Sequence, residues 1–72
     1  MNQKRMKKKN LAKNIKTLRI EKGWTQEELA EKSGVTYTTI IKLEQGVVDN
    51  PTLKTLESLA MVFSVTLDDL TQ

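Results

Sequence analysis

Cysteine and histidine are both absent from the 72 residues of this sequence. Without them the chain cannot build a disulfide scaffold, a zinc finger, a thiol nucleophile or a Ser-His-Asp triad. The sequence also shows no carboxylate pair and no phosphate-binding loop. We therefore expect no enzymatic activity, no cofactor, no metal site and no evident small-molecule ligand. The lack of cysteine fits a reducing cytoplasm, where we expect the protein to act.

Glycine and proline are also scarce, with three and one residues respectively. So few of them argue against a disordered or low-complexity chain. No uncharged run approaches the roughly 20 residues that a membrane-spanning helix requires. The basic start MNQKRMKKKN is not followed by an apolar stretch, so we expect no secretory signal. The length fits one small domain.

Charge is distributed unevenly along the chain. The net charge is only +3, but residues 1–22 carry nine basic side chains and one acid, and residues 23–72 carry three basic side chains and eight acids. A small protein polarised in this way suggests a polyanion as partner. We predict a flexible basic N-terminal arm over residues 1–9 and a folded domain over residues 10–72. The Lys4–Lys9 cluster has two interpretations, an arm that follows a phosphate backbone or a solvated tail.

Apolar residues recur at helical spacing through the rest of the chain. From Leu11 the spacing predicts a first helix that ends at Gly23. A second helix is predicted over Thr25–Lys32, because the Thr25-Gln26-Glu27-Glu28 segment has the pattern of a capping box. Trp24, just before this cap, is predicted to belong to the core. The helix stops near Ser33, and Gly34 is suited to a tight turn.

The third helix is predicted over Thr36–Gln45, between a Thr cap and Gly46. Its β-branched residues also allow a strand over TYTTII, but a short helical domain favours the helix. A fourth helix is predicted from Pro51 and Thr52 to about Phe63, with the inward stripe Leu53, Leu56, Leu59, Ala60 and Phe63. A last short turn is predicted over Leu67 to Leu70. The sequence thus predicts an all-α domain of five helices with short loops.

The second and third predicted helices, joined by Ser33-Gly34-Val35, have the pattern of a helix-turn-helix. Their residues resemble the lambda-repressor/Cro-like helix-turn-helix family, also called the xenobiotic-response-element family. The matching residues are Thr25, Gln26, Leu29, Ala30, Ser33, Gly34, Val35, Ile40, Leu43, Glu44 and Gly46, followed by Pro51, Thr52, Leu53, Leu56, Ala60, Phe63, Val65, Leu67, Asp68 and Leu70. The resemblance covers about residues 11–70 and implies a compact five-helix DNA-binding domain.

One face of the third helix is a candidate surface for reading DNA bases. At 100° per residue, Ile40 and Leu43 point to the core, and the opposite face carries the candidates Tyr37, Thr38, Ile41 and Lys42. Lys42 can donate to guanine, and the threonine and isoleucine methyl groups can contact thymine. The family often has Gln, Asn or Arg at such positions, and this chain has none at these four. No operator sequence follows from these residues.

Several other residues are candidates for phosphate contacts. The resemblance implies that Gln26 anchors a DNA phosphate, which suits its place at a helix N-terminus. Resemblance and position add four more phosphate candidates: Thr36, Thr39, Gln45 and Arg19. The resemblance also implies a structural salt bridge between Arg19 and Glu44, and we regard this as the first role of Arg19.

Apolar residues after the third helix and on the fourth predict a homodimer. The family often dimerises through the loop after the third helix and through the last helix. The candidate interface residues here are Val47, Val48, Met61, Val62 and Val65. The alternative is scattered apolar surface on a monomer. A dimer would read two half-sites one helical turn apart.

Two functions are compatible with these features. The first is a sequence-specific DNA-binding transcriptional regulator. Repression is the commonest activity in the family, so a repressor is expected. Activation through RNA polymerase is open, because the second helix carries Glu27, Glu28 and Glu31. The second is a protein-interaction module, such as an antitoxin or anti-repressor partner, which the apolar Ile41 favours.

Overall fold

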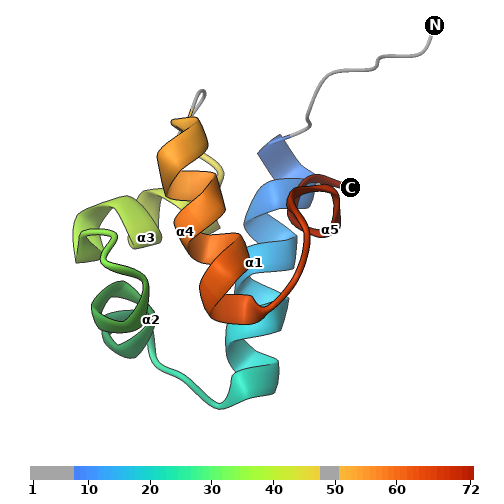
Figure 1. The fold of residues 1–72 in the computed structure, drawn as a ribbon. Coiled ribbons are helices and arrows are strands. Elements are labelled where there is room, and N and C mark those ends of the chain that lie inside the picture. Colours follow the sequence, from blue (N-terminus) through green and yellow to red (C-terminus); the bar gives the residue numbers. More distant parts are fainter. Residues whose placement is uncertain (1–7, 48–50) are drawn as a thin grey trace, which may run out of the picture.

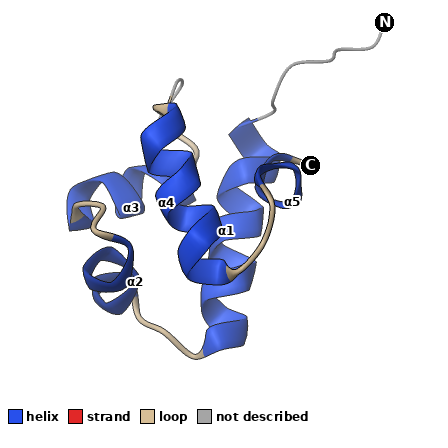
Figure 2. Ribbon diagram, viewed as in Figure 1, coloured by secondary structure: helices blue, strands red, loops and turns tan. Residues whose placement is uncertain are grey.

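The computed structural model describes residues 8–47 and 51–72, with side chains from Asn10 onward. Over these residues the chain forms five helices joined by short loops, and no strand (Figure 2). The helices are α1 (Lys8–Lys22), α2 (Gln26–Ser33), α3 (Tyr37–Gln45), α4 (Leu53–Phe63) and α5 (Leu67–Thr71). The all-α, five-helix prediction is confirmed. Helix α1 begins at Lys8, within the segment predicted as an arm, and residues 1–7 of that segment lie outside the described residues.

Four of the helices begin with the same device. The hydroxyl of a threonine before each helix accepts the backbone N–H of the residue three positions later, and these caps are Thr25, Thr36, Thr52 and Thr66. The predicted capping box of α2 is confirmed, because Glu28 Oε1 also accepts the Thr25 N–H at 2.8 Å. These caps satisfy N–H groups that have no partner within the helix.

The predicted strand alternative for TYTTII is not adopted. Helix α3 covers residues 37–41 of this segment. Thr36 caps the helix, and Gly46 ends it in the left-handed conformation. Ile40 and Leu43 are buried at 0% and 2% exposure, as the helical spacing predicts. Burial of this face and the two caps outweigh the weak helix propensity of the β-branched residues.

The core lies where all five helices meet. Its buried members come from every helix and are Leu11, Ile15, Leu29, Ile40, Leu43, Leu59, Ala60, Phe63 and Leu70. Trp24 packs against this cluster and stacks on Phe63, with ring centroids 5.9 Å apart. The predicted inward position of Leu53 is wrong, because this side chain is 60% exposed. Leu53 is the first residue of α4, almost one turn before the helix meets the core at Leu56.

The arrangement leaves the two helices of the helix-turn-helix together on one side of the molecule. Figure 1 shows α2 and α3 on the left, α4 across the front, and α5 beside α1 on the right. Helix α1 packs against both α3 and α5. The amide of Asn14 in α1 donates to the Leu70 carbonyl at 2.8 Å and so ties α5 to α1. The face of α3 opposite its buried residues therefore remains uncovered.

Candidate nucleic-acid interface

The turn between α2 and α3 is held by its own hydrogen bonds. Gly34 ends α2 in the left-handed conformation, with φ of 76°, and its N–H donates to the Ala30 carbonyl at 2.9 Å. The Val35 N–H donates to the hydroxyl of Ser33 at 3.2 Å. A residue with a side chain is strained at this φ, which explains the glycine. The turn therefore sets a fixed angle between the two helices.

The predicted reading face of α3 is exposed at three of its four positions. Tyr37, at 44% exposure, Thr38 and Lys42 are exposed, and Ile41 is half-buried. The phosphate candidate Gln45 is exposed as well, on the same side of the helix. Of these, Lys42 supplies the single charge. The face can thus offer one cationic donor, hydroxyl groups, an amide and methyl groups, all of which suit the edges of base pairs.

Two predicted phosphate candidates lie at the start of α3, where Thr36 is the cap and Thr39 is in the first turn. The Thr36 hydroxyl lies 2.9 Å from the Thr39 hydroxyl and accepts the Thr39 N–H at 3.3 Å. Thr36 is exposed and Thr39 is half-buried. Their first role is local, and both hydroxyls lie at the positive end of α3, where an anion is favoured.

Arg19 and Glu44 form the predicted salt bridge. Arg19 Nε donates to Glu44 Oε2 at 2.7 Å and Nη2 donates to Oε1 at 3.0 Å, so the contact is bidentate. Arg19 Nη1 also donates to the Trp24 carbonyl at 2.9 Å. Only 13% of the Arg19 side chain and 4% of the Glu44 side chain are exposed. The pair joins α1 to the end of α3 and to the loop before α2.

The electrostatic environment of Arg19 favours its charged form. The hydrogen bond to Glu44 raises the pKa of Arg19 above its ordinary value; burial lowers it in part, and the charge of the carboxylate raises it further. Arginine is already protonated at all ordinary pH values. The guanidinium therefore remains a cation opposite the carboxylate.

Gln26 belongs to the same hydrogen-bond network as Arg19 and Glu44. Its position in the sequence did not predict this contact. Its Nε2 donates to Glu44 Oε1 at 3.1 Å, and the side chain is half-buried. The structure thus brings Gln26, Arg19 and Glu44 together at the junction of α1, α2 and α3. This contact joins residues 18 positions apart, and no local pattern in the sequence signals it.

Lys54 is a residue of this surface that the sequence reasoning missed. A depression of about 250 Å³ lies between the helix-turn-helix and the start of α4, and its lining comprises Gly34, Val35, Thr36, Thr39, Lys54, Thr55 and Ser58. Lys54 is exposed and brings a positive charge beside the capped start of α3. A signal was present in the sequence, since Lys54 is one of only three basic residues after position 22.

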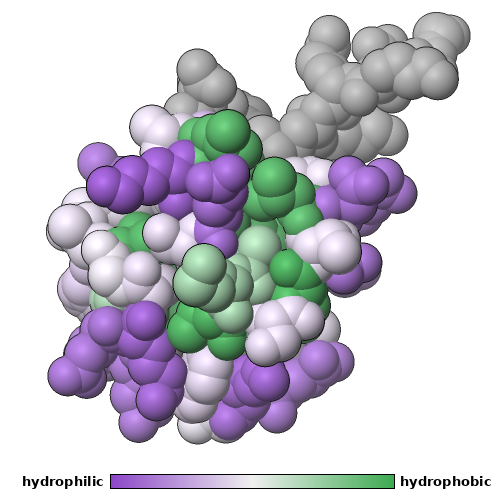
Figure 3. Space-filling model, viewed as in Figure 1, coloured by the Kyte–Doolittle hydropathy of each residue, from purple (hydrophilic) through white to green (hydrophobic). Residues whose placement is uncertain are grey.

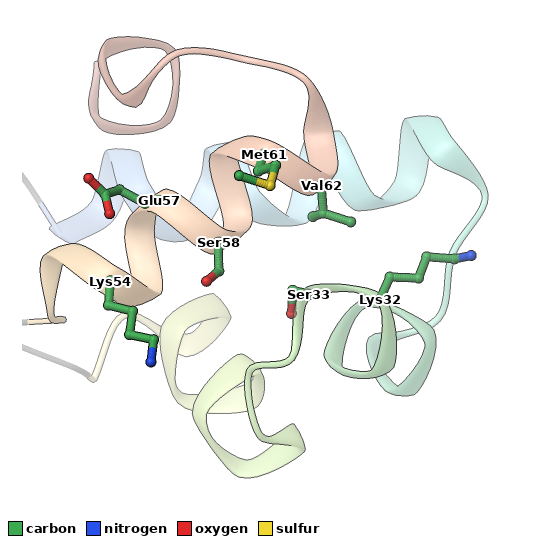
Figure 4. Close-up of a pocket in the computed structure, with 7 residues that line it drawn as sticks. All are labelled: Lys32, Ser33, Lys54, Glu57, Ser58, Met61 and Val62. Carbon is green, nitrogen blue, oxygen red and sulfur yellow. The ribbon is translucent and has the colours of Figure 1, made fainter.

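The predicted dimer residues do not form one continuous patch. Met61, at 80% exposure, and the half-buried Val62 line a groove of about 430 Å³ between α2 and α4 (Figure 4). Val47 is 57% exposed and follows the end of α3. Val65 packs against the core and lines a separate depression beside α1. Val48 lies outside the described residues.

The surface around the groove is mixed. Apolar side chains gather over α4 in the middle of the face in Figure 3, with hydrophilic side chains on both sides. In Figure 4 Lys54 and Lys32 stand at opposite ends of the groove. Among residues 8–47 and 51–72, no helix has the length and apolar character to cross a membrane, and no cluster of acidic residues is suited to a metal ion.

Comparison with known proteins identifies the fold. Residues 15–70 match the family HTH_3, described as helix-turn-helix. A transcriptional regulator of this type from Archaeoglobus fulgidus is 45% identical over 56 residues, which cover 78% of this chain and 79% of the relative. The regulator SinR of Bacillus subtilis is 35% identical over 60 residues, 83% of this chain, and the match spans only 54% of SinR.

A solved DNA complex and an antitoxin are also similar to this chain. The crystal structure of SinR in complex with DNA superposes with a TM-score of 0.82 and 34% identity, over 86% of this chain and 98% of that one. The antitoxin HipB of Escherichia coli is 44% identical over 63 residues, which cover 82% of this chain and 68% of HipB.

Proposed function

Because this chain belongs to the helix-turn-helix family HTH_3, a lambda-repressor/Cro-like DNA-binding domain, we propose that it is a sequence-specific transcriptional regulator. It inserts α3 into the major groove and binds as a homodimer. It represses by blocking a promoter and acts in the cytoplasm. The observation that carries this proposal is the uncovered face of α3, which stands beside a rigid turn and opposite a buried face. This is how a recognition helix is presented to DNA.

Bases are read by four side chains on the exposed face of α3. Lys42 donates to guanine, and Ile41 and the Thr38 methyl group contact thymine methyl groups. The Thr38 hydroxyl exchanges hydrogen bonds with base edges. Tyr37 stands at the start of the helix, within reach of a base or a phosphate. Because most of this face is uncharged, shape and methyl contacts contribute much of the specificity.

Phosphates are bound at the flanks of the recognition helix. Gln26 at the start of α2, Thr36 and Thr39 at the start of α3, and Gln45 at its end supply hydrogen bonds. Lys54 adds a cation beside Thr36 and Thr39. Such contacts fix the orientation of the protein without reading sequence. Arg19 uses three nitrogen atoms within the protein, which favours its structural role over a phosphate contact.

A gel mobility shift with a DNA library of random sequence tests the proposal. Retardation at low salt, followed by enrichment of one sequence over successive rounds, is the expected result. Binding should weaken steeply as salt rises, because phosphate contacts release counterions. A chain that retards no DNA at low salt is not a DNA-binding regulator.

The homodimer needs its own experiment. Light scattering at micromolar concentration, with and without DNA, measures the mass of the species. We expect Met61→Lys to weaken the dimer and Leu53→Lys to leave it intact, since Leu53 is similarly exposed on the same helix but outside the predicted interface. A wild-type protein that stays monomeric on DNA contradicts the dimer.

A second function, a protein-interaction module such as an antitoxin, is favoured by two observations. HipB is an antitoxin, and Ile41 places an apolar side chain on the outward side of α3. In that case the exposed face of α3 binds protein and the mobility shift fails. RNA polymerase is a further partner for an activator, through the exposed Glu27, Glu28 and Glu31 of α2.

A further inference from the structure

The carboxylate of Glu44 is a shared acceptor for groups from two other helices. Its Oε1 accepts from Arg19 Nη2 of α1 at 3.0 Å and from Gln26 Nε2 of α2 at 3.1 Å. Its Oε2 accepts from Arg19 Nε at 2.7 Å. With 4% of its side chain exposed, Glu44 has little freedom to move. The acceptor that Gln26 meets is therefore held in one place.

This arrangement fixes a side chain that is otherwise flexible. A glutamine amide has two N–H groups and one carbonyl oxygen, and Glu44 occupies one of the N–H groups. The second N–H and the carbonyl remain for a ligand at the start of α2. A side chain that folding has already ordered loses less rotational freedom when it binds.

We propose that Glu44 is a positioning residue for the phosphate contact of Gln26, and that Arg19 makes this arrangement compatible with a DNA phosphate. This inference rests on the proposed DNA-binding function and deepens it. Glu44 orients the Gln26 amide so that its second N–H donates to a phosphate oxygen. The salt bridge thus acts in DNA binding as well as in the fold.

Arg19 is required because a phosphate and a carboxylate repel each other. The phosphate that binds Gln26 would lie one amide group away from Glu44. Without Arg19, the negative charge of Glu44 would oppose it across a partly buried site, where screening by salt is weak. The bidentate contact with Arg19 compensates this charge at short distance. A neutral acceptor at position 44 would serve the same purpose without a cation.

A comparison of two double variants isolates this role. Arg19→Met with Glu44→Gln removes both charges and keeps an acceptor for Gln26. Arg19→Met with Glu44→Leu removes both charges and the acceptor. Replacing both members of a buried pair by side chains of similar size avoids an unpaired buried charge, so both proteins should fold. Far-ultraviolet circular dichroism checks the fold of each.

Gln26→Ala is then introduced into wild type and into both backgrounds, and DNA affinity is measured by fluorescence anisotropy with the selected site. We expect Gln26→Ala to weaken DNA binding about fivefold in wild type and in the Arg19→Met, Glu44→Gln variant (the glutamine background). A fivefold loss corresponds to the free energy of about one hydrogen bond. In the leucine background it should have no effect, because that protein has already lost the contact. The leucine background itself should bind about fivefold more weakly than the glutamine background.

A nuclear magnetic resonance measurement gives a second readout that does not depend on DNA. The two side-chain N–H signals of Gln26 should be well separated in wild type and in the glutamine background, since one proton is hydrogen-bonded. In the leucine background they should move to the positions of a free glutamine. If the salt bridge had only a structural role, Gln26→Ala would weaken DNA binding by the same factor in all three proteins.

The outcomes distinguish this inference from the function on which it rests. If wild type binds no DNA, the proposed function fails and the inference fails with it. If wild type binds DNA and Gln26→Ala weakens all three proteins equally, the proposed function stands and the positioning role is wrong. If Gln26→Ala has no effect in wild type, Gln26 binds no phosphate and the inference is again wrong.

Discussion

Replacing Arg19 by methionine should strongly destabilise this small domain. Methionine preserves much of the side-chain length but removes the guanidinium. Three hydrogen bonds are lost, two to Glu44 and one to the Trp24 carbonyl. Glu44 then remains as a carboxylate with 4% exposure and no cation beside it. This uncompensated charge, more than the lost attraction, determines the cost.

The expected loss is about 3–5 kcal/mol of the free energy of unfolding, the range for breaking a buried pair. A chain of this length has a total stability of roughly 4–11 kcal/mol. The variant should therefore lose a large part of its stability and be partly unfolded at 37 °C. The ionised form of Arg19 contributes to the free energy of unfolding throughout the neutral pH range. Its folded pKa is raised above the unfolded value, so this contribution is lost only at extreme alkaline pH.

Urea unfolding followed by fluorescence measures this loss directly. Trp24 is the single tryptophan and stacks on Phe63, so its emission reports the packing of the core. The double variant Arg19→Met with Glu44→Leu should regain most of the stability, since no charge is left buried. A loss below about 1 kcal/mol in the single variant would refute the reasoning, because the pair would then behave as an exposed ion pair.

Three further predictions concern the cap of α4 and the DNA surface. Ser64 has a φ of 59°, so Ser64→Gly should raise the free energy of unfolding by about 0.5–1 kcal/mol in the same urea assay; a destabilised variant would contradict this. Lys42→Ala should relax sequence preference at one base pair, by about 1–3 kcal/mol in competition binding; a uniform loss over all sequences would exclude the guanine contact. Lys54→Ala should lower the salt dependence of DNA binding by about 0.9 in slope, and Lys32→Ala, at the far end of the groove, should not; equal slopes for the two variants would remove Lys54 from the interface.

Local signals in the sequence predicted most of the fold. The four threonine caps and the glycines that end the first three helices depend on residues a few positions apart, and apolar spacing identifies the buried residues of α3. The same spacing failed for Leu53, because periodicity does not show where along a helix the core begins. The sequence also allowed a strand in place of α3. Helix propensity depends on each residue alone, and burial depends on how the whole chain packs.

The site was less accessible from sequence than the fold. The resemblance implied the salt bridge of Arg19 and Glu44, and the structure contains it. The bond from Gln26 to Glu44 and the position of Lys54 beside Thr36 depend on how separate helices pack, so no local pattern indicates them. The assignment of bases and phosphates to particular residues remains a prediction.

Selection of a binding site from random DNA tests the central claim most directly, namely that α3 of this domain reads DNA sequence. Repeated rounds with the wild-type protein should enrich a two-fold symmetric site whose half-sites are about one helical turn apart, 10–10.5 base pairs from centre to centre. Sequencing of the selected pool reports specificity and symmetry together. A pool that remains random after selection at low salt would contradict the account.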